Sequence, residues 1–469
     1  MAGLFGTLNQ SVQSLHAQSI GIEVAGRNLA NVNNPDFSRQ RVVFGDRGTV
    51  ITPQGAQSLG IEAKSVQQIR DFLIDQQVSR ETASLASLTA ENDIYSKTQA
   101  ALGESIDSTK KATSPAAGMS GVVSGFFNAF KAFAASPTDM GQRQNLIQQA
   151  GILTDRFNST DERLAQVQAA AGTNIAADVA TVNDLLANVA SLNSQIGGLE
   201  INAVGTAVHL RDQRQAAIEK LAGLIGAETA PNATQVGQVD VFVRDGSGNA
   251  ITLVSLASVN NPVNYIGTGL TAGTSGTPIA LTSGKVNGLF KARDGAVQDL
   301  RDSLNTFAGQ IGLAVNTAYN PLSTPGANFF TFTTGSAAST LTVAAGLTPA
   351  TLKASNGAVG DNTLAAAVAA LASRSFAVTS GDAIDGTFSQ YFSGVVSDFG
   401  RTVASTSNRL EDQSTITKLV NQQRQSLSGV SMDEEMADLL KYQRAFEASS
   451  KVISIIDGLI DIVVNRLGR

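Results

Sequence analysis

The side chains best suited to acid–base chemistry in this sequence are its two histidines, which lie in unrelated contexts. His16 falls within a predicted N-terminal helix, and His209 precedes Leu210-Arg211-Asp212. No Gly-x-Ser-x-Gly nucleophile elbow accompanies either histidine, so a Ser-His-Asp arrangement is not indicated. The chain has no cysteine, which excludes a thiolate nucleophile and a sulfur-ligated metal site. We therefore predict no catalytic residue and a protein that is not an enzyme.

A run of three acids, Asp433-Glu434-Glu435, comes nearest to a set of metal ligands. Consecutive positions on a helix point in different directions, so these carboxylates cannot converge on one ion. They fit better as the first turn of a helix that begins at Ser431, where Ser-x-x-Glu forms a capping box and the helix dipole favours acids. Paired glycines such as those at 246 and 248 do not open a helix after a strand. We predict no metal and no cofactor.

Composition and charge exclude further classes of function. The chain has 469 residues, a formal net charge of -6, a sequence pI near 5.1 and no basic cluster, whereas phosphate binding needs a basic surface. We therefore expect no nucleic-acid partner. The N-terminus lacks a basic segment followed by an apolar one, and no run reaches about 18 uninterrupted apolar residues. We expect no cleaved Sec signal peptide and no membrane insertion.

Each end of the chain predicts a helix with an apolar stripe. Along the first helix, apolar and small residues follow in alternating steps of four and three, which line one side of a helix; the stripe of the last helix is broader. Neither helix can bury its stripe alone. We predict that the two pack against each other, against other copies of the protein, or both. The residues assigned to this assembly interface are Leu8, Val12, Leu15, Ile22, Leu29, Met436, Leu439, Phe446, Ile453, Ile456, Leu459, Ile460, Val463 and Leu467.

Between the ends, the same spacing predicts several more long helices. The longest runs from about residue 138 to 199, and steps of four between Val167 and Val179 form a stutter. That helix either straightens or breaks near Gly172. Trp is absent and aromatic residues make up 5% of the chain, a composition that suits thin helical bundles better than a thick core.

Two stretches depart from the helical pattern. In the first, residues 225–285, Val239, Val241 and Val243 alternate with polar residues, and Asp245-Gly246-Ser247-Gly248-Asn249 predicts the turn of a hairpin. The second, residues 322–388, is rich in Gly, Ser, Thr and Ala with short apolar runs. We interpret the two stretches as one β-rich domain inserted into a helical body.

The predicted fold class is therefore mainly α with an inserted β-rich domain, elongated, with the terminal helices forming a coiled-coil-like pair and a long helical bundle in the body. We assign residues 1–45 and 429–469 to the terminal polymerisation region. Residues 46–224, 286–321 and 389–428 form the helical bundle domain, and residues 225–285 and 322–388 form the β-rich insertion.

The two ends also carry motifs that resemble those of the bacterial flagellar axial proteins, the group that forms rod, hook and hook-filament junction. Residues 28–39 read NLANVNNPDFSR, and residues 428–436 read SGVSMDEEM, followed by YQRAF at 442–446. One departure is Asp36, where the group usually has Gly; Asp also tolerates turn conformations. The motif residues assigned on this resemblance are Asn28, Asn31, Asn33, Pro35, Phe37, Arg39, Asp433, Glu434, Glu435 and Gln443.

Within that group, the segments LRDQR at 210–214 and VNGLF at 286–290 point to the hook-filament junction proteins. The resemblance is not detectable over residues 225–285 or 322–388. It implies a structural adaptor between hook and filament that self-assembles as a ring or tube of identical subunits. It further implies contacts with hook protein and with a second junction protein, an export chaperone at the C-terminal helix, and a secreted, extracellular location in the flagellum, reached without a cleaved signal peptide.

Two alternatives stay open at this point. Another axial protein, of hook or distal rod, would share the end motifs but should lack the helix of residues 138–199. A different class of protein would use the β-rich insertion as a surface-binding adhesin or a hydrolytic module, although residues 225–285 offer no site for hydrolysis.

Overall fold

The computed structural model describes residues 3–52, 55–103, 118–357 and 360–465. The chain divides into two compact units: unit 1 comprises residues 1–86, 178–285 and 412–469, and unit 2 comprises residues 87–177 and 286–411. Helices α2 (Phe72–Leu102), α4 (Met140–Leu199) and α10 (Phe388–Ser428) contribute residues to both units. The predicted class, mainly helical with inserted strands, is confirmed.

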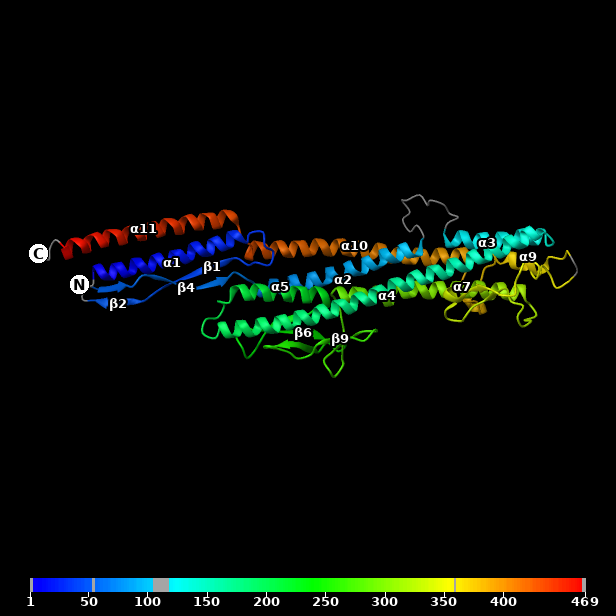
Figure 1. Cartoon of the computed structure of the whole chain (residues 1–469), viewed down its shortest axis with the longest axis horizontal. Helices are drawn as coiled ribbons and strands as arrows, with labels where there is room; N and C mark the ends of the chain where they lie inside the picture. Colours follow the sequence, from blue (N-terminus) through cyan, green and yellow to red (C-terminus); the bar gives the residue numbers. More distant parts are fainter. Residues whose placement is uncertain (1–2, 53–54, 104–117, 358–359, 466–469) are drawn as a thin grey trace. The chain divides into compact units, whose positions relative to one another are not determined.

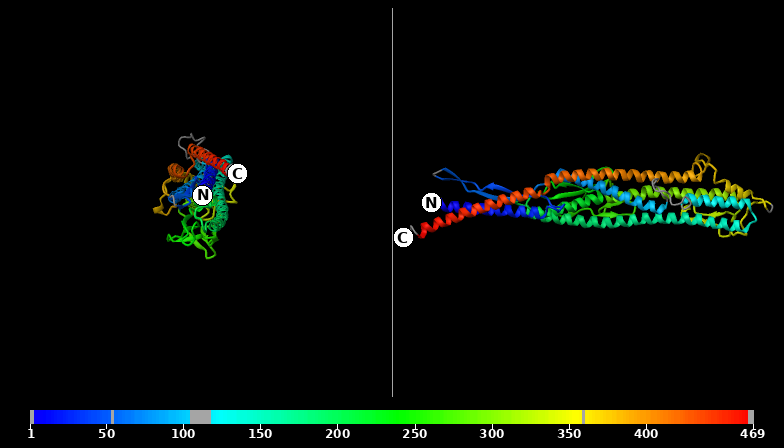
Figure 2. Two further views of the ribbon diagram at one scale, coloured as in Figure 1. Left: turned by 90° about the vertical axis from the view of Figure 1, so that its left-hand side faces the viewer. Right: turned by 90° about the horizontal axis from the view of Figure 1, so that it is seen from above.

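In unit 1, the two ends of the chain form the predicted helix pair. Helices α1 (Leu4–Ala30) and α11 (Met432–Asn465) run side by side in opposite directions in both Figure 1 and the right-hand view of Figure 2. The helix α10 ends at Ser428 and α11 begins at Met432, so only three residues separate them. We call residues 429–431 the joint and the two terminal helices the terminal pair.

A two-stranded ribbon follows α1. Strands β1 (Gln40–Asp46) and β4 (Ile61–Gln68) pair antiparallel with a bulge between Val43 and Phe44, and β2 (Thr49–Thr52) pairs with β3 (Gly55–Ser58) farther along the ribbon. Strands β1 and β4 contact α1, so an apolar helix covers a ribbon that would be marginally stable alone.

The stretch of residues 225–285 folds into small antiparallel sheets within unit 1. One has the order β5-β6-β7-β8, and the other has the order β11-β10-β9. The predicted hairpin is confirmed, because β6 and β7 pair around the turn that begins at Asp245. Their bounds are β5 Glu228–Pro231, β6 Val239–Arg244, β7 Ala250–Ser255, β8 Ser258–Val259, β9 Val263–Tyr265, β10 Leu270–Ala272 and β11 Thr277–Ile279.

Asparagines on helices hold the strands by their backbone. In each case the side-chain amide donates to the carbonyl and accepts from the N–H of one extended residue, as a neighbouring strand would. The donor–acceptor distances are 2.7 to 3.3 Å. We call these residues the asparagine anchors: Asn28 on Gln40, Asn183 on Val263, Asn193 on Val239, and Asn316 on Phe330.

Unit 2 concentrates the aromatic residues of the chain in one core. Phe126, Phe130, Phe329 and Phe330 are fully buried, with ring centroids 4.8 to 5.9 Å apart. The sparse aromatics therefore build a thicker core here than the composition indicated. Besides its parts of α2, α4 and α10, unit 2 contains the following elements: α3 Met119–Ala135, α6 Lys285–Lys291, a π turn Ala292–Ala296, α7 Val297–Tyr319, β12 Phe330–Thr331, α8 Ala337–Thr340, β13 Thr342–Val343, α9 Thr363–Ala370 and a 3-10 turn Val378–Ser380.

The two glycine-rich stretches fall in different compact units. Residues 225–285 belong to unit 1 and residues 322–388 to unit 2, and the strands of each stretch pair only with strands of the same stretch among the described residues. The second stretch has just the two-residue strands β12 and β13. Its few charges and short apolar runs reflect burial against the aromatic core, which composition alone cannot distinguish from strand pairing.

Helix α4 is continuous through Gly172, so the stutter does not break it. Its stripe is buried on both sides of the stutter, as Leu153 and Leu186 illustrate. This helix is long and apolar enough to meet a length and composition criterion for crossing a membrane. The burial of most of that stripe inside the structure is typical of a core helix.

Candidate functional site

The terminal pair is held together by the small side chains of α1. Ala17, Gly21 and Ala25 are buried, and at Gly21 the backbone of α1 comes close to α11. A Cβ atom on Gly21 would lie 2.9 Å from the ring of Tyr442, which also packs on Phe44 at 6.0 Å between ring centroids. Tyr442 therefore fits over a helix position that only glycine leaves open.

The residues predicted as the assembly interface are divided by the structure. On α11, Leu439, Phe446, Ile453 and Ile460 are partly buried and Ile456 is buried, all on the side of α1. On α1, Ser14, Gly21 and Asn28 contact α11. The leucine stripe is less buried: Leu8, Leu15, Ile22 and Leu29 are half-buried and Val12 is exposed. Met436, Leu459 and Val463 are exposed, and Leu467 lies outside the described residues.

The half of the terminal pair farthest from the joint, which we call the distal half, is apolar and poor in charge. Residues 4–22 of α1 contain no Asp, Glu, Lys or Arg. The charged residues in the segment 452–464 of α11 are two aspartates. Large apolar side chains are nevertheless exposed there, with Phe5 at 66% and Ile455 at 59%. The exposed set on α11 follows a helical stripe: Val452, Ile455, Leu459 and Ile462.

The half nearest the joint is polar, and its centre is Glu435, which is 3% exposed. The carboxylate of Glu435 accepts hydrogen bonds from Arg39 Nε at 2.7 Å and from Asn28 Nδ2 at 2.9 Å. Arg39 also donates to Glu434 at 2.6 Å, and its guanidinium lies 3.9 Å from Asp438. Because Asn28 also anchors Gln40, one network joins α1, β1 and the start of α11. We call this network the terminal clamp.

Electrostatics favour the charged form of Arg39. Burial by itself would lower the pKa of Arg39, but the charge and hydrogen bonds of Glu435 and Glu434 outweigh burial and raise that pKa. Glu434 lies in the predicted capping box, yet its carboxylate pairs with Arg39. Two of the three consecutive acids, Glu434 and Glu435, therefore bind Arg39. The favourable effect of acids on the helix dipole did not predict this pairing.

The other motif residues lie outside the clamp. Asn31 and Asn34 bond to each other and shape the turn after α1, while Pro35 and Phe37 continue that turn. Asp433 and Gln443 are exposed on α11, and Asn33 is exposed in the turn. Sequence reasoning missed Gln40, Gly21 and Tyr442. The small residues at 17, 21 and 25, spaced by four, were the signal for the close helix contact.

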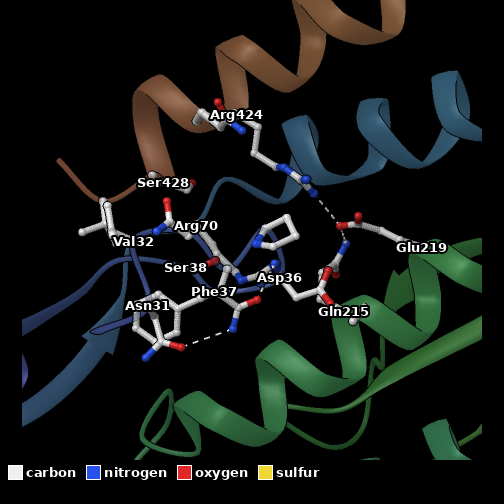
Figure 3. Close-up of a pocket in the computed structure, with 17 residues that line it drawn as sticks. Asn31, Val32, Asp36, Phe37, Ser38, Arg70, Gln215, Glu219, Arg424 and Ser428 are labelled. Carbon is white, nitrogen blue, oxygen red and sulfur yellow. Dashed lines mark hydrogen bonds and ion pairs between the residues drawn. The ribbon is translucent and has the colours of Figure 1, made fainter. Parts of the chain in front are cut away.

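The turn after α1 borders an open pocket of about 330 Å³ beside the joint, drawn in Figure 3. Residues 31–38 form one wall, and side chains of α5 (Val208–Ile225) and of the end of α10 form the others. Arg424 on α10 reaches Glu219 on α5 at 2.6 Å, and Gln215 donates to the same carboxylate oxygen at 3.1 Å. The pocket is lined by amides and paired charges and holds no set of metal ligands among the described residues.

The motif of residues 210–214 cross-links unit 1. Arg211 forms a 2.5 Å ion pair with the fully buried carboxylate of Glu200, and Asp212 pairs with Arg70 at 2.9 Å. Arg214 donates to Asn193 and to the carbonyl of Gly237. Burial, with the neighbouring charge of Arg211, lowers the pKa of Arg214 to about 10. The motif residues thus fix α5 to α4, to the segment after β4 and to the loop before β6.

The motif of residues 286–290 makes a close helix crossing in unit 2. A Cβ atom on Gly288 would overlap the carbonyl oxygen of Ser87 on α2, and Asn287 Nδ2 lies 3.2 Å from the hydroxyl of Ser87. Glycine is required where the backbones of α6 and α2 touch. His16 and His209 are both exposed and far apart in sequence, in keeping with their unrelated contexts.

Comparison with known proteins identifies the family. The model of the flagellar hook-associated protein FlgK helical domain matches residues 74–330, and the model of the flagellar basal body rod FlgEFG protein C-terminal region matches residues 421–467. Flagellar hook-associated protein 1 of Bacillus subtilis (strain 168) is 25% identical over 524 residues, covering 100% of this chain and 99% of that relative.

Two further matches are partial. Flagellar hook-associated protein 1 of Escherichia coli (strain K12) is 25% identical over 324 residues, which is 67% of this chain and 56% of that relative. The solved structure of the flagellar hook junction protein FlgK from Burkholderia pseudomallei is 19% identical, with a TM-score of 0.45 over 55% of this chain and 47% of that one.

The match over residues 74–330 favours a junction protein over a hook or distal rod protein, and no comparison points to an adhesin. The family consists of structural proteins of the flagellum and is not an enzyme family. This chain belongs to the FlgK family of flagellar hook-associated proteins, structural components of the junction between hook and filament.

Proposed function

We propose that the terminal pair is the element by which this protein joins its neighbours in the flagellum. The observation that carries the proposal is the distal half, whose large apolar side chains lie in the open on helices almost without charge. Interface cores are depleted in charged residues, whereas exposed helices of isolated proteins carry many. Burying one large apolar side chain contributes about 1.5 to 3 kcal/mol, so several buried together can offset the entropy of association.

In this proposal the two halves of the terminal pair have separate tasks. The terminal clamp sets the register of α11 on α1 within one copy, through Glu435, Arg39 and Asn28. The leucine stripe of α1 and the stripe of Val452 to Ile462 on α11 then contact other copies in a ring or tube. The half-buried state of Leu8, Leu15 and Ile22 supports this division, because those side chains keep free surface after the pair has formed.

The finer partners follow from the family and belong to the proposal. The assembled ring contacts hook protein on one side and a second junction protein on the other, outside the cell, after export without a cleaved signal peptide. Before assembly, an export chaperone covers the stripe of α11 by helix-in-groove recognition. Residues 1–45 and 429–469 form the polymerisation region, and residues 46–224, 286–321 and 389–428 form the helical bundle.

Substitution of Ile455 tests the proposal more cleanly than substitution of Ile456. Ile456 is 5% exposed within one chain, so an aspartate there would separate α11 from α1 even in the monomer. Ile455→Asp places the same charge on the open stripe. The matched control is Ser454→Asp, which adds a charge one position away on the polar side of α11, next to Ser450 and Asp457.

The measurement is made in flagellated cells whose own copy is replaced by each variant. We expect Ile455→Asp cells to build hooks without filaments, while filament subunits still reach the medium and Ser454→Asp cells stay motile. Circular dichroism of the purified variants verifies that both retain the helix content of the wild type. Normal filaments on Ile455→Asp hooks would refute the assignment of this stripe to the assembly interface. Missing hooks would indicate that the protein acts in the rod or the hook.

A further inference from the structure

The terminal pair is attached to the rest of unit 1 through two separate connections. The first is the chain that leaves α1 and returns along β4, and the second is the joint at residues 429–431. Each connection makes its own contact with α5, and the pocket of about 330 Å³ lies between them. The angle at which the terminal pair leaves unit 1 therefore depends on how both connections are fixed to one helix.

The first connection is held near the start of α5. Gln68 at the end of β4 donates to the carbonyl of Val208 at 2.6 Å. Two residues later, Arg70 bridges Asp212 on α5 at 2.9 Å and Asp75 on α2 at 3.0 Å. Arg70 is 19% exposed and both carboxylates are more deeply buried, so this attachment is largely shielded from solvent.

The second connection is held two turns farther along α5. Helix α10 contacts α2 through Thr417, whose hydroxyl bonds to the carbonyl of Glu81 at 3.3 Å. Beyond that contact, the last turns of α10 are tied to α5 by the ion pair between Arg424 and Glu219. Their side chains are 19% and 20% exposed, so this pair is partly shielded from solvent, and its carboxylate is more exposed than the two carboxylates of the Arg70 bridge.

The joint transmits this attachment to the terminal pair. The backbone N–H of Arg39 donates to the carbonyl of Ser428, the last residue of α10, at 2.9 Å, and Arg39 also holds Glu435 on α11. Moving the end of α10 therefore moves the terminal clamp. The pocket leaves room for such movement, since open space rather than packed side chains fills the interval between the two connections.

We propose that Arg424 and Glu219 are positioning residues that fix the angle between the terminal pair and the rest of unit 1. With the pair intact, both connections are fixed to α5 and the angle has one value. Without it, the terminal pair pivots on the Arg70 bridge, and the pocket closes or widens. This inference rests on the proposed assembly role of the terminal pair, because a ring of copies requires each pair to point in one direction.

A distance measurement in the purified monomer tests the proposal. The chain has no cysteine, so Asp184→Cys on α4 and Glu447→Cys on α11 introduce two unique, exposed sites for spin labels within unit 1. Pulsed electron paramagnetic resonance then gives the distribution of label distances. The backgrounds compared are wild type, Arg424→Gln, Glu219→Gln, and the charge swap that combines Arg424→Glu with Glu219→Arg.

We expect each single substitution to shift and broaden the distance distribution and the charge swap to restore it, with unchanged helix content throughout. A distribution that stays as narrow as wild type in both single variants would overturn the proposal, as would a swap that behaves like the singles. In cells, the singles should attach fewer filaments than the swap; altered distances with normal filament attachment would overturn the link to assembly. The proposed assembly role of the terminal pair is tested separately, by filament attachment in cells that carry Ile455→Asp.

Discussion

The sharpest prediction concerns two adjacent acids that bind the same arginine. Glu435 and Glu434 both pair with Arg39, at 2.7 and 2.6 Å, but Glu435 is 3% exposed and the side chain of Glu434 is 62% exposed. Distance alone would rank the two pairs as equal. Burial ranks them differently, because a shielded pair is weakened less by solvent and because its loss leaves buried groups without a partner.

The expected magnitude follows from what each substitution leaves behind. Glu435→Ala removes two charge-assisted hydrogen bonds, from Arg39 and Asn28, and breaking a fully buried pair costs about 3 to 5 kcal/mol. Arg39 is 22% exposed and keeps Glu434, and Asn28 keeps Gln40, so we reduce the cost to about 2 kcal/mol. Glu434→Ala should cost about 0.5 kcal/mol, as a surface pair does.

Native-state hydrogen exchange, read by mass spectrometry on peptides from the start of α11, measures both costs as local opening. A loss of about 2 kcal/mol corresponds to roughly 30-fold faster exchange, and about 0.5 kcal/mol to roughly twofold. Peptides from α7 in unit 2 serve as an internal control and should not change. Equal acceleration by the two substitutions, or none by Glu435→Ala, would show that burial does not determine the strength of the clamp.

Three further predictions concern the body of the protein. Gly288→Ala should destabilise unit 2 by roughly 1 to 3 kcal/mol, because the new methyl group meets the backbone of Ser87, whereas the control Gly309→Ala meets only Ala337 at 3.6 Å and should be neutral or stabilising; thermal denaturation distinguishes them. Leu256 has a positive φ of 57°, so Leu256→Asn should raise stability by about 0.5 to 1 kcal/mol in chemical denaturation, while Leu256→Ala, which keeps the strain, should not. Burial alone would raise the pKa of Glu200, but hydrogen bonds from Arg211, Gly205 and Ala207 outweigh it and hold that pKa below the ordinary value. The Glu200 carboxylate therefore stabilises the loop after α4 at pH values above about 4.5, and the protection of that loop from exchange should fall as the pH drops below this value.

Periodicity in the sequence was sufficient for the helices and for one hairpin. The stripe of α4 from Leu153 to Leu186 is buried as predicted, and alternation around Asp245 located β6 and β7. Both patterns arise from burial inside one chain, and such burial is accompanied by a regular spacing of apolar residues in the sequence. The apolar stripe of α1 has the same spacing, yet its leucines are only half-buried, while Tyr442 of α11 packs over Gly21. Periodicity shows that a face is buried and does not tell which molecule buries it.

The terminal clamp was within reach of sequence reasoning only in part. Asn28, Arg39 and Glu435 were named through the family motifs, but nothing in their spacing revealed that residues about 400 positions apart share one hydrogen-bond network. Gln40 was missed because its contribution is made by its backbone. The division of the two glycine-rich stretches between the two units had no signal in the sequence either, since composition does not tell which elements bury small residues.

The asparagine anchors affect how far the sequence of residues 225–285 can be changed. Asn183 and Asn193 hold Val263 and Val239 by peptide groups alone, so the attachment places no chemical demand on the side chains of those strands. The family model spans residues 74–330, so the strands of residues 225–285 lie inside the matched region. A foreign segment could be inserted at the exposed turn of residues 246–249 and displayed at the flagellar junction, provided that both asparagines and the buried residues Val241, Val243 and Val263 remain.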